Sequence, residues 1–146
     1  MNVITDDIGE YSATVWTHFL APHNAGAFPV SAARVFKGHA GARRLGREVE
    51  FQLQVGADGK IADCRYRVYG CPATIALCSL ASEALKGLSL DDAATFSAVL
   101  LAEQYGLPAE KRAAAIMVED AIRAAVAEYN TQQRPLTVAG FEAKQA

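Results

Sequence analysis

The sequence predicts an α+β fold in which a three-stranded antiparallel sheet packs against helices. Residues 47–55 and 61–69 each alternate apolar with polar side chains, as half-buried strands do, and Asp58-Gly59 between them is a hairpin signal. From Cys71 onward the spacing of apolar residues is helical. Because strands come first and helices follow, the pattern favours an α+β arrangement over a parallel, doubly wound sheet.

Two segments precede this hairpin. Residues 11–20 predict an amphipathic helix, because Tyr11, Val15 and Phe19 share one helical stripe. Residues 33–38 predict the first strand of the sheet. The sheet is therefore expected to be a meander of consecutive strands.

Further helices are expected in the second half of the chain. Pro72 suits a first helical position, Gly87 suits a helix end, and the capping box of Ser89 and Asp92 begins a second helix that runs toward the stretch EQYG. A final helix begins near Pro108. Its inward face is expected to hold Ala114, Val118, Ala121, Ile122, Ala125 and Tyr129, whereas Lys111, Arg112, Glu119 and Arg123 point elsewhere.

Length and composition bound the class of protein. A chain of 146 residues is long enough for one domain that buries roughly 70% of its unfolded surface. We expect residues 1–130 to form this domain and residues 131–146 to form a C-terminal tail. With 51% apolar residues, 21% charged residues and a net charge of -2, the composition argues against disorder and against nucleic-acid binding.

Composition also bears on location. No apolar run approaches the length of about 18 residues that a membrane span needs. The stretch MNVITDDIGEY carries acidic residues where a signal peptide is basic and then apolar. We therefore expect a cytoplasmic protein without membrane contact. An odd number of cysteines in that setting argues against a disulfide framework and leaves metal binding, sulfur chemistry or burial.

The stretch YSATVWTHFLAPHNAG resembles the opening signature of the IscU/NifU N-terminal family of iron–sulfur cluster scaffold proteins. The likeness continues through VYGCPATIA, SLASEALKGLSLDDA and VEDAIRAAVAEY, and it covers nearly the whole chain except the tail. It implies an IscU-like fold and a site at one end of the molecule where a two-iron cluster is built on cysteines, an aspartate and a histidine. The matching positions of the opening signature are Tyr11, Ser12, Val15, His18, Phe19, Pro22, Asn24 and Gly26.

Most of the family's ligand positions are replaced in this chain. The family's Cys-Gly-Asp aligns with Leu45 to Arg47, and its His-Cys pair aligns with Ala113 and Ala114. Cys71 alone stands at a family ligand position. Thiolates are the soft ligands that iron–sulfur clusters need, and one cluster needs about four of them. The resemblance therefore implies a degenerate site, in which Cys71 binds sulfur, iron or a labile iron–sulfur cluster.

Two interpretations of Cys71 stay open. At a helix N-terminus the backbone amides and the macrodipole favour a thiolate, which makes the sulfur a nucleophile toward a persulfide. Alternatively, the thiol is a packed remnant of the family's site. Pro72 modestly favours this second view, because it removes one N–H donor at the helix start.

The other cysteines and the histidines are expected to be structural. Cys64 lies on the apolar strand face, and Cys78 lies about 10 Å beyond the helix start, which is too far for both it and Cys71 to bind one iron. His18 reads as a hydrogen-bonded structural histidine, and neither His23 nor His39 has ligand spacing to another candidate. A cluster shared between subunits stays open.

A basic stretch stands where the family has its first cysteine loop. We expect FKGHAGARRLGREV to form a loop that brings Lys37, Arg43, Arg44 and Arg47 together. These cations would neutralise a thiolate, or receive an anion or an acidic partner surface. The alternative is a solvated loop without a binding role.

The segment LPAEK marks a candidate partner contact. Family members display Leu-Pro-Pro-Val-Lys to a dedicated Hsp70-type chaperone, and this chain keeps Leu107, Pro108 and Lys111 of that motif. We take these residues as the candidate partner-binding set. Glu110 adds a charge to a peptide expected to bind in an apolar groove, which argues against recognition by such a chaperone.

These observations favour an accessory protein of iron–sulfur cluster assembly over an enzyme. Cys71 would handle sulfur or a labile cluster while the chain docks on a cysteine desulfurase or another assembly protein. The alternative is a non-catalytic binding or regulatory module that binds no cluster. An enzyme with Cys71 as nucleophile ranks last, because Ala113 replaces the family's histidine and no other base is assured.

Overall fold

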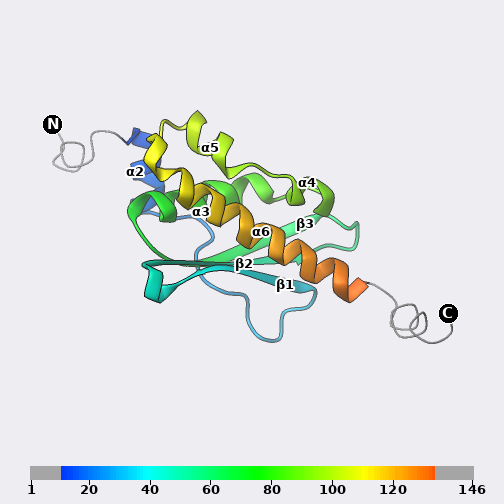
Figure 1. Cartoon of the computed structure of the whole chain (residues 1–146). Coiled ribbons are helices and arrows are strands. Elements are labelled where there is room, and N and C mark those ends of the chain that lie inside the picture. Colours follow the sequence, from blue (N-terminus) through cyan, green and yellow to red (C-terminus); the bar gives the residue numbers. More distant parts are fainter. Residues whose placement is uncertain (1–10, 134–146) are drawn as a thin grey trace, which may run out of the picture.

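The sheet is a three-stranded antiparallel meander with helices on one of its faces (Figure 1). The computed structural model describes residues 11–133. Its strands are β1 (Val35–Ala42), β2 (Arg47–Val55) and β3 (Ile61–Tyr69). The α+β prediction is thus confirmed, and β2 and β3 have the predicted bounds. β1 begins two residues later than predicted and continues to Ala42, because its residues pair with β2 up to the turn.

The helices follow the predicted order with two differences. Ser12 accepts a hydrogen bond from the Val15 amide at 3.3 Å, so the first helix begins after Ser12 rather than at residue 11. The elements are α2 (Ala13–Leu20), α3 (Pro72–Leu85), α4 (Leu90–Ala94), α5 (Ala98–Gln104) and α6 (Arg112–Gln133), with short 3-10 turns η1 (Arg43–Leu45) and η2 (Ala109–Lys111).

The second predicted helix is wrong as a single element, because it is divided into α4 and α5. The Thr95 hydroxyl donates to the Asp92 carbonyl at 3.2 Å where α4 ends. The Ser97 hydroxyl then accepts from the Leu100 amide at 3.0 Å and caps α5. Threonine and serine compete with the backbone for hydrogen bonds in this way, and two such residues in succession break the helix.

The two faces of the sheet are covered differently. The apolar residues of β2 are buried on the face that carries the helices: Val49, Phe51, Leu53 and Val55. On the other face Gln52 is only 2% exposed. The segment between α2 and β1 crosses this face (Figure 1), where the Phe28 amide donates to Gln52 Oε1 at 2.9 Å. Arg65 stacks on the Phe28 ring, with its guanidinium carbon 4.9 Å from the ring centroid.

Helix α6 runs along β1 and closes the core. The buried residues of α6 are Ala114, Ala115, Met117, Val118, Ala121, Ile122, Ala125 and Val126. The predicted inward face is therefore confirmed, and Tyr129, which is partly buried, packs against the core with its ring at 85° to that of Phe36. The helix continues past the predicted domain boundary at residue 130. Residues 134–146 of the predicted tail lie outside the described part of the chain. No helix among residues 11–133 is long and apolar enough to cross a membrane.

The contact between β1 and α6 depends on the absence of a side chain at Gly38. A Cβ atom at this position would lie 2.1 Å from the Ala121 carbonyl oxygen and 2.2 Å from the Ala125 amide nitrogen. Both are backbone atoms, so neither can rotate away. Strand and helix are therefore held at a distance that only glycine permits.

We expect Gly38→Ala to lower the free energy of unfolding by about 2 to 3 kcal/mol, because α6 must move off the sheet. Urea denaturation followed by circular dichroism measures the change. Gly56→Ala is the matched control, since the tightest contact of a Cβ there is with the Asp58 side-chain oxygen at 3.1 Å, and the Lys60 carbonyl oxygen and the Ala62 Cβ lie at ordinary contact distances of 3.6 and 3.7 Å. We expect it to change stability by less than about 0.5 kcal/mol. Equal stability losses in the two variants would contradict this account of the interface.

Candidate functional site

Cys71 lies in a pocket formed where three distant segments meet. The pocket has a volume of about 160 Å³. It is lined by Gly46 and Arg47 at the start of β2, by Cys71 and Thr74 at the start of α3, and by Glu110, Lys111 and Ala114 at the start of α6. The fold therefore brings together three of the positions where the resemblance expects ligands: Arg47, Cys71 and Ala114. Leu45 is 68% exposed and Ala113 is exposed, and neither of them lines the pocket.

The thiol of Cys71 is half-buried and has polar neighbours on two sides. Its Sγ atom lies 3.3 Å from the Thr74 hydroxyl and 3.9 Å from the Lys111 ammonium nitrogen. Burial raises the pKa of this thiol, but the hydroxyl and backbone amide of Thr74 and the positive charge of Lys111 outweigh it. The pKa of Cys71 is therefore held below the usual value of a cysteine, which supports the interpretation as a working thiol.

Lys111 does not belong to the inward face of the last helix, as predicted, but the contact of its side chain with Cys71 is not part of that prediction. The prediction begins the helix near Pro108, whereas residues 109–111 form the 3-10 turn η2 ahead of α6. A 3-10 turn has about three residues per turn instead of about 3.6, so the helical phase does not carry through it. Burial lowers the pKa of Lys111, but Cys71 and Tyr11 outweigh that effect and raise it, so the side chain stays charged beside the sulfur.

The other two cysteines are buried in the core, as predicted. Cys64 Sγ donates to the Ser82 carbonyl at 3.1 Å, and burial raises the pKa of this thiol to about 12. Cys78 is completely buried among core side chains, and burial alone raises the pKa of this thiol. Both thiols are therefore protonated and shielded at neutral pH.

The predicted structural role of His18 is confirmed. Its Nδ1 atom shares a hydrogen bond of 2.6 Å with the Ser79 hydroxyl, which also accepts from the His23 amide at 2.8 Å. Burial, followed by the neighbouring His23, lowers the pKa of His18. The His23 side chain pairs with Glu83, with 3.4 Å between nitrogen and oxygen. These contacts join the start of the chain to α3, and no group of three or more metal-binding side chains occurs among residues 11–133.

The chain matches the NifU-like N terminal domain over residues 10–135. It belongs to that family. An iron-sulfur cluster assembly scaffold protein IscU of Escherichia coli (strain K12) is 38% identical over 123 residues, which are 84% of this chain and 96% of the relative. The iron-sulfur cluster assembly enzyme IscU of Drosophila melanogaster is 35% identical over 124 residues, which are 85% of this chain and 80% of the relative.

A solved structure agrees with the fold of this NifU-like domain. The N-terminal part of a NifU-like protein from Brucella abortus superposes with a TM-score of 0.62, over 90% of this chain and 99% of that one. The sequences are 15% identical, so this comparison bears on the fold alone. It confirms the predicted IscU-like arrangement of sheet and helices.

The predicted basic loop is wrong in two respects for this NifU-like domain. Lys37 and His39 lie on β1, opposite Gln52 and Glu50 of β2, so Lys37 is not part of a cluster with Arg47. Only residues 43–46 form the connection between the two strands. The loop is expected because this stretch stands where the family has its first cysteine loop, whereas residues up to Ala42 pair with β2 and Gly38 packs closely under α6.

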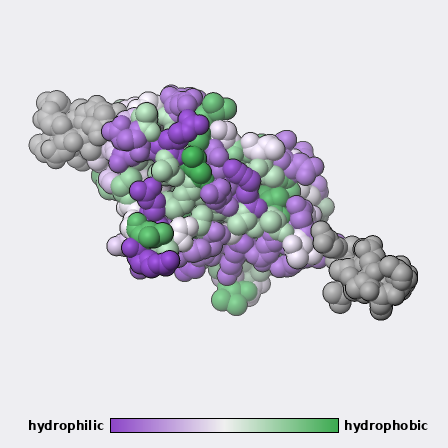
Figure 2. Space-filling model, in the orientation of Figure 1, coloured by the Kyte–Doolittle hydropathy of each residue, from purple (hydrophilic) through white to green (hydrophobic). Residues whose placement is uncertain are grey.

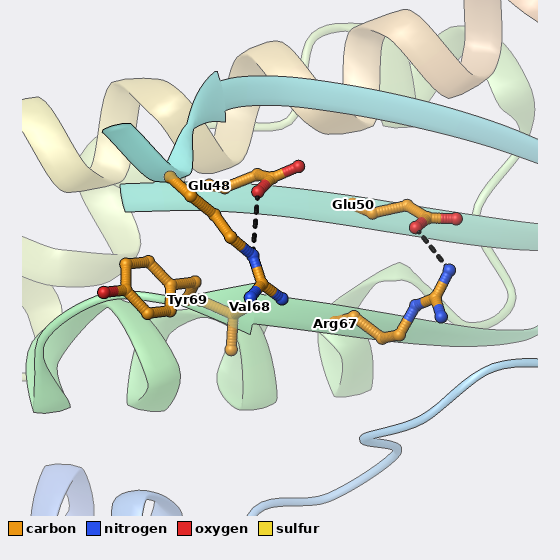
Figure 3. A pocket seen from close by; sticks show the side chains of 6 residues that line it. Glu48, Glu50, Arg67, Val68 and Tyr69 are labelled. Atoms are coloured by element: carbon orange, nitrogen blue, oxygen red, sulfur yellow. Dashed lines mark hydrogen bonds and ion pairs between the residues drawn. The ribbon is translucent and has the colours of Figure 1, made fainter. Parts of the chain in front are cut away.

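Arg43 is one of the residues that line a second concave surface, on the outer face of the sheet. Figure 3 shows this surface from close by. This surface encloses about 280 Å³ and is lined by Arg43, Glu48, Glu50, Arg67, Val68 and Tyr69. The opposite charges pair within it, Arg43 with Glu48 at 3.4 Å and Arg67 with Glu50 at 2.8 Å. The surface is larger than the Cys71 pocket, but it carries no thiol and its charges are already neutralised.

The candidate partner-binding residues of the NifU-like domain lie in unequal surroundings. Leu107 is 8% exposed and belongs to the core, Pro108 is half-buried, and Lys111 faces Cys71. Leu107 and Pro108 line a shallow cavity of about 170 Å³ between α5 and α6. On this side of the molecule the strongly hydrophobic residues lie in small separate patches among hydrophilic ones (Figure 2).

We expect Lys111→Met to slow alkylation of Cys71 by iodoacetamide several-fold at pH 7, because loss of the ammonium group raises the pKa of the thiol. Alkylation rates measured against pH by mass spectrometry of the Cys71 peptide test this. Cys64 and Cys78 serve as internal standards that stay unmodified in the folded protein.

Lys86→Met is the matched control, because Lys86 follows the C-terminal end of α3, whereas Cys71 precedes its N-terminal end. Lys86 pairs there with Asp63 and Glu83. It removes the same charge from the same domain and should leave the Cys71 profile in place. An unchanged profile in Lys111→Met would mean that the ammonium group does not act on the thiol.

Proposed function

We propose that this NifU-like domain is an accessory component of iron–sulfur cluster assembly that handles sulfur, or a labile cluster, through Cys71. One observation carries the proposal: a polarised thiol lies in a pocket built by three segments of the family's site, with Lys111 3.9 Å from its sulfur. The printed names of the relatives, which describe iron–sulfur cluster assembly, support the general role. Cysteine desulfurases are the class of partner that would supply the sulfur.

The residues that line the pocket favour transient binding of sulfur or iron over stable binding of an iron–sulfur cluster. A cluster requires about four ligands, mostly thiolates, and Cys71 is the only cysteine, histidine or aspartate among the residues that line this pocket. Carboxylates are weaker ligands for iron–sulfur chemistry, and Glu110 is the only one present. Iron and sulfide are therefore cargo for this protein, held by one strong ligand at most within a single chain.

The first test is transfer of sulfur to Cys71. The domain is incubated with a cysteine desulfurase and cysteine, and intact-protein and peptide mass spectrometry measure the gain of a sulfur atom. We expect the wild type to gain one sulfur on Cys71 and Cys71→Ser to gain none, because the thiolate attacks the outer sulfur of the donor persulfide and the donor leaves as a thiolate. An unmodified Cys71 beside an active desulfurase would contradict the proposal.

The second test is anaerobic reconstitution with iron, sulfide and a desulfurase, followed by visible spectroscopy. We expect no stable stoichiometric two-iron cluster on the wild-type monomer. The triple variant Leu45→Cys, Arg47→Asp, Ala114→Cys restores thiolate and carboxylate ligands at the family positions and is the positive control. A stable two-iron cluster on the wild-type monomer would show that residues besides Cys71 serve as ligands, and it would contradict the proposal of a degenerate site.

A non-catalytic binding module is the second candidate, favoured by the replaced ligands at Leu45, Arg47, Ala113 and Ala114. In that case Cys71→Ser keeps full affinity for the partner and full activity in cells. For docking we propose the segment Leu107, Pro108 and Lys111, which rests on its match to the family motif. Since Leu107 belongs to the core, binding through it requires the segment ahead of α6 to move away from the core.

A further inference from the structure

The walls of the Cys71 pocket carry charges opposite to those of a metal site. Two of the residues that line the pocket have cationic side chains, Arg47 and Lys111, and one has a carboxylate, Glu110. Metal sites gather anionic or neutral donor atoms around a cation. A pocket whose lining residues carry two cations, one of them 3.9 Å from the sulfur, instead favours an anion.

Lys111 and Arg47 differ in whether their charges already have a partner. Lys111 is directed at Cys71, 3.9 Å from its sulfur. Arg47 is exposed, and among residues 11–133 no carboxylate forms an ion pair with it. Arg43 and Arg112 do have such partners, Glu48 and Glu103, and Arg44, which also lacks one among these residues, does not line the pocket. Arg47 is therefore the arginine of the pocket lining whose charge no carboxylate of residues 11–133 neutralises.

We infer that the Cys71 pocket takes sulfur preferentially from anionic donors, namely disulfides and persulfides that carry a carboxylate close to the reacting sulfur. This inference rests on the proposed function, because it names the donor class for the same thiol. A guanidinium binds a carboxylate through two parallel hydrogen bonds, which fixes orientation as well as position. Pairing with Arg47 would hold the donor while its sulfur meets Cys71.

The size of the pocket limits how much of a donor enters. Its volume of about 160 Å³ is smaller than the roughly 300 Å³ of the smallest typical ligand pockets. It admits the sulfur and a nearby carboxylate, while the remainder of the donor stays outside. Thr74, 1% exposed with its hydroxyl 3.3 Å from Cys71 Sγ, supports the sulfur from the inner side.

The exchange step is balanced without a further reactant. The Cys71 thiolate attacks one sulfur of the donor disulfide, a new S–S bond forms to Cys71, and the other sulfur leaves as a thiolate. Cys71 is oxidised and the donor is reduced. With a persulfide donor the same attack on the outer sulfur transfers that sulfur to Cys71.

Glu110, which lines the same pocket, weakens the preference for anionic donors. Its negative charge repels an anionic donor and helps to hold Lys111 in the charged form. The two residues can therefore be varied in opposite directions. Arg47→Gln should lower the preference for anions, and Glu110→Gln should raise it.

The experiment measures mixed-disulfide formation at Cys71 by mass spectrometry, with no iron and no partner protein. The probes are 3,3′-dithiodipropionate, which is net negative and has a carboxylate close to each sulfur, hydroxyethyl disulfide, which is neutral, and cystamine, which is positive. At low ionic strength we expect the full chain to react about tenfold faster with 3,3′-dithiodipropionate than with cystamine, and we expect high salt to reduce this ratio. Rates relative to the neutral probe correct for changes in the thiolate fraction.

Arg47→Gln is expected to reduce the anion-to-neutral rate ratio, and Glu110→Gln to increase it. Arg123→Gln is the matched control, since Arg123 pairs with Glu119 and Asp120 farther along α6 and should keep the wild-type ratio. Circular dichroism of each variant confirms that it is folded.

Two results would overturn the inference. The first is a wild-type rate ratio near one, or one that favours cystamine. The second is an equal ratio in Arg47→Gln and Glu110→Gln. In either case Cys71 could still accept sulfur from a desulfurase, so the proposed function would stand. A Cys71 inert to all three probes would overturn both.

Discussion

The architecture depends on a backbone-to-backbone contact between β1 and α6 at Gly38. With no side chain between them, the strand meets the helix at Ala121 and Ala125, and the position of the whole helix follows from this contact. The N-terminal end of α6 lies about two helical turns away from Ala121, and there Lys111 and Ala114 reach the Cys71 pocket. The local charge around the thiol is thus set by packing in a different part of the core.

The site combines a retained nucleophile with a changed electrostatic setting. Thr74 and Lys111 favour the thiolate of Cys71, although the thiol is half-buried. Arg47 stands where the family resemblance expects an aspartate, and Ala114 where it expects a cysteine. Loss of these anionic ligands, together with gain of a cation, is the basis of the proposal that the pocket handles sulfur. The family's fold can therefore be kept while the chemistry of its site is altered.

Sequence reasoning succeeded where local patterns decide the structure. Strict alternation defines the faces of β2 and β3, so the burial of Cys64 follows directly from its place in the pattern. It failed where side-chain hydrogen bonds interrupt an apolar helical pattern, and where a 3-10 turn precedes a helix and changes the direction in which side chains point. Thr95 and Ser97 divide one apolar pattern into α4 and α5, and η2 turns Lys111 toward Cys71.

The pocket itself lay beyond local patterns. The family resemblance supplied its positions, Arg47, Cys71 and Ala114, but the contact with Lys111 arises only from tertiary packing. Lys37 shows the reverse error, because neighbours in the sequence were assumed to be neighbours in space. The chain turns between β1 and β2, so Lys37 lies opposite Gln52, five residues along β2 from Arg47, which is about 17 Å.

The burial of two of the three cysteines has a kinetic consequence for the domain. Cys78 lies about 10 Å from Cys71 along α3, and Cys64 lies back along β3 beneath the surface, so neither meets the roughly 7 Å limit for Cα atoms joined by a disulfide to Cys71. Oxidation of the half-buried thiol then requires a second molecule in every case. The rate of this oxidation therefore depends on the concentration of that second molecule. The fraction of Cys71 that is oxidised then follows the concentration of such molecules in the surrounding solution.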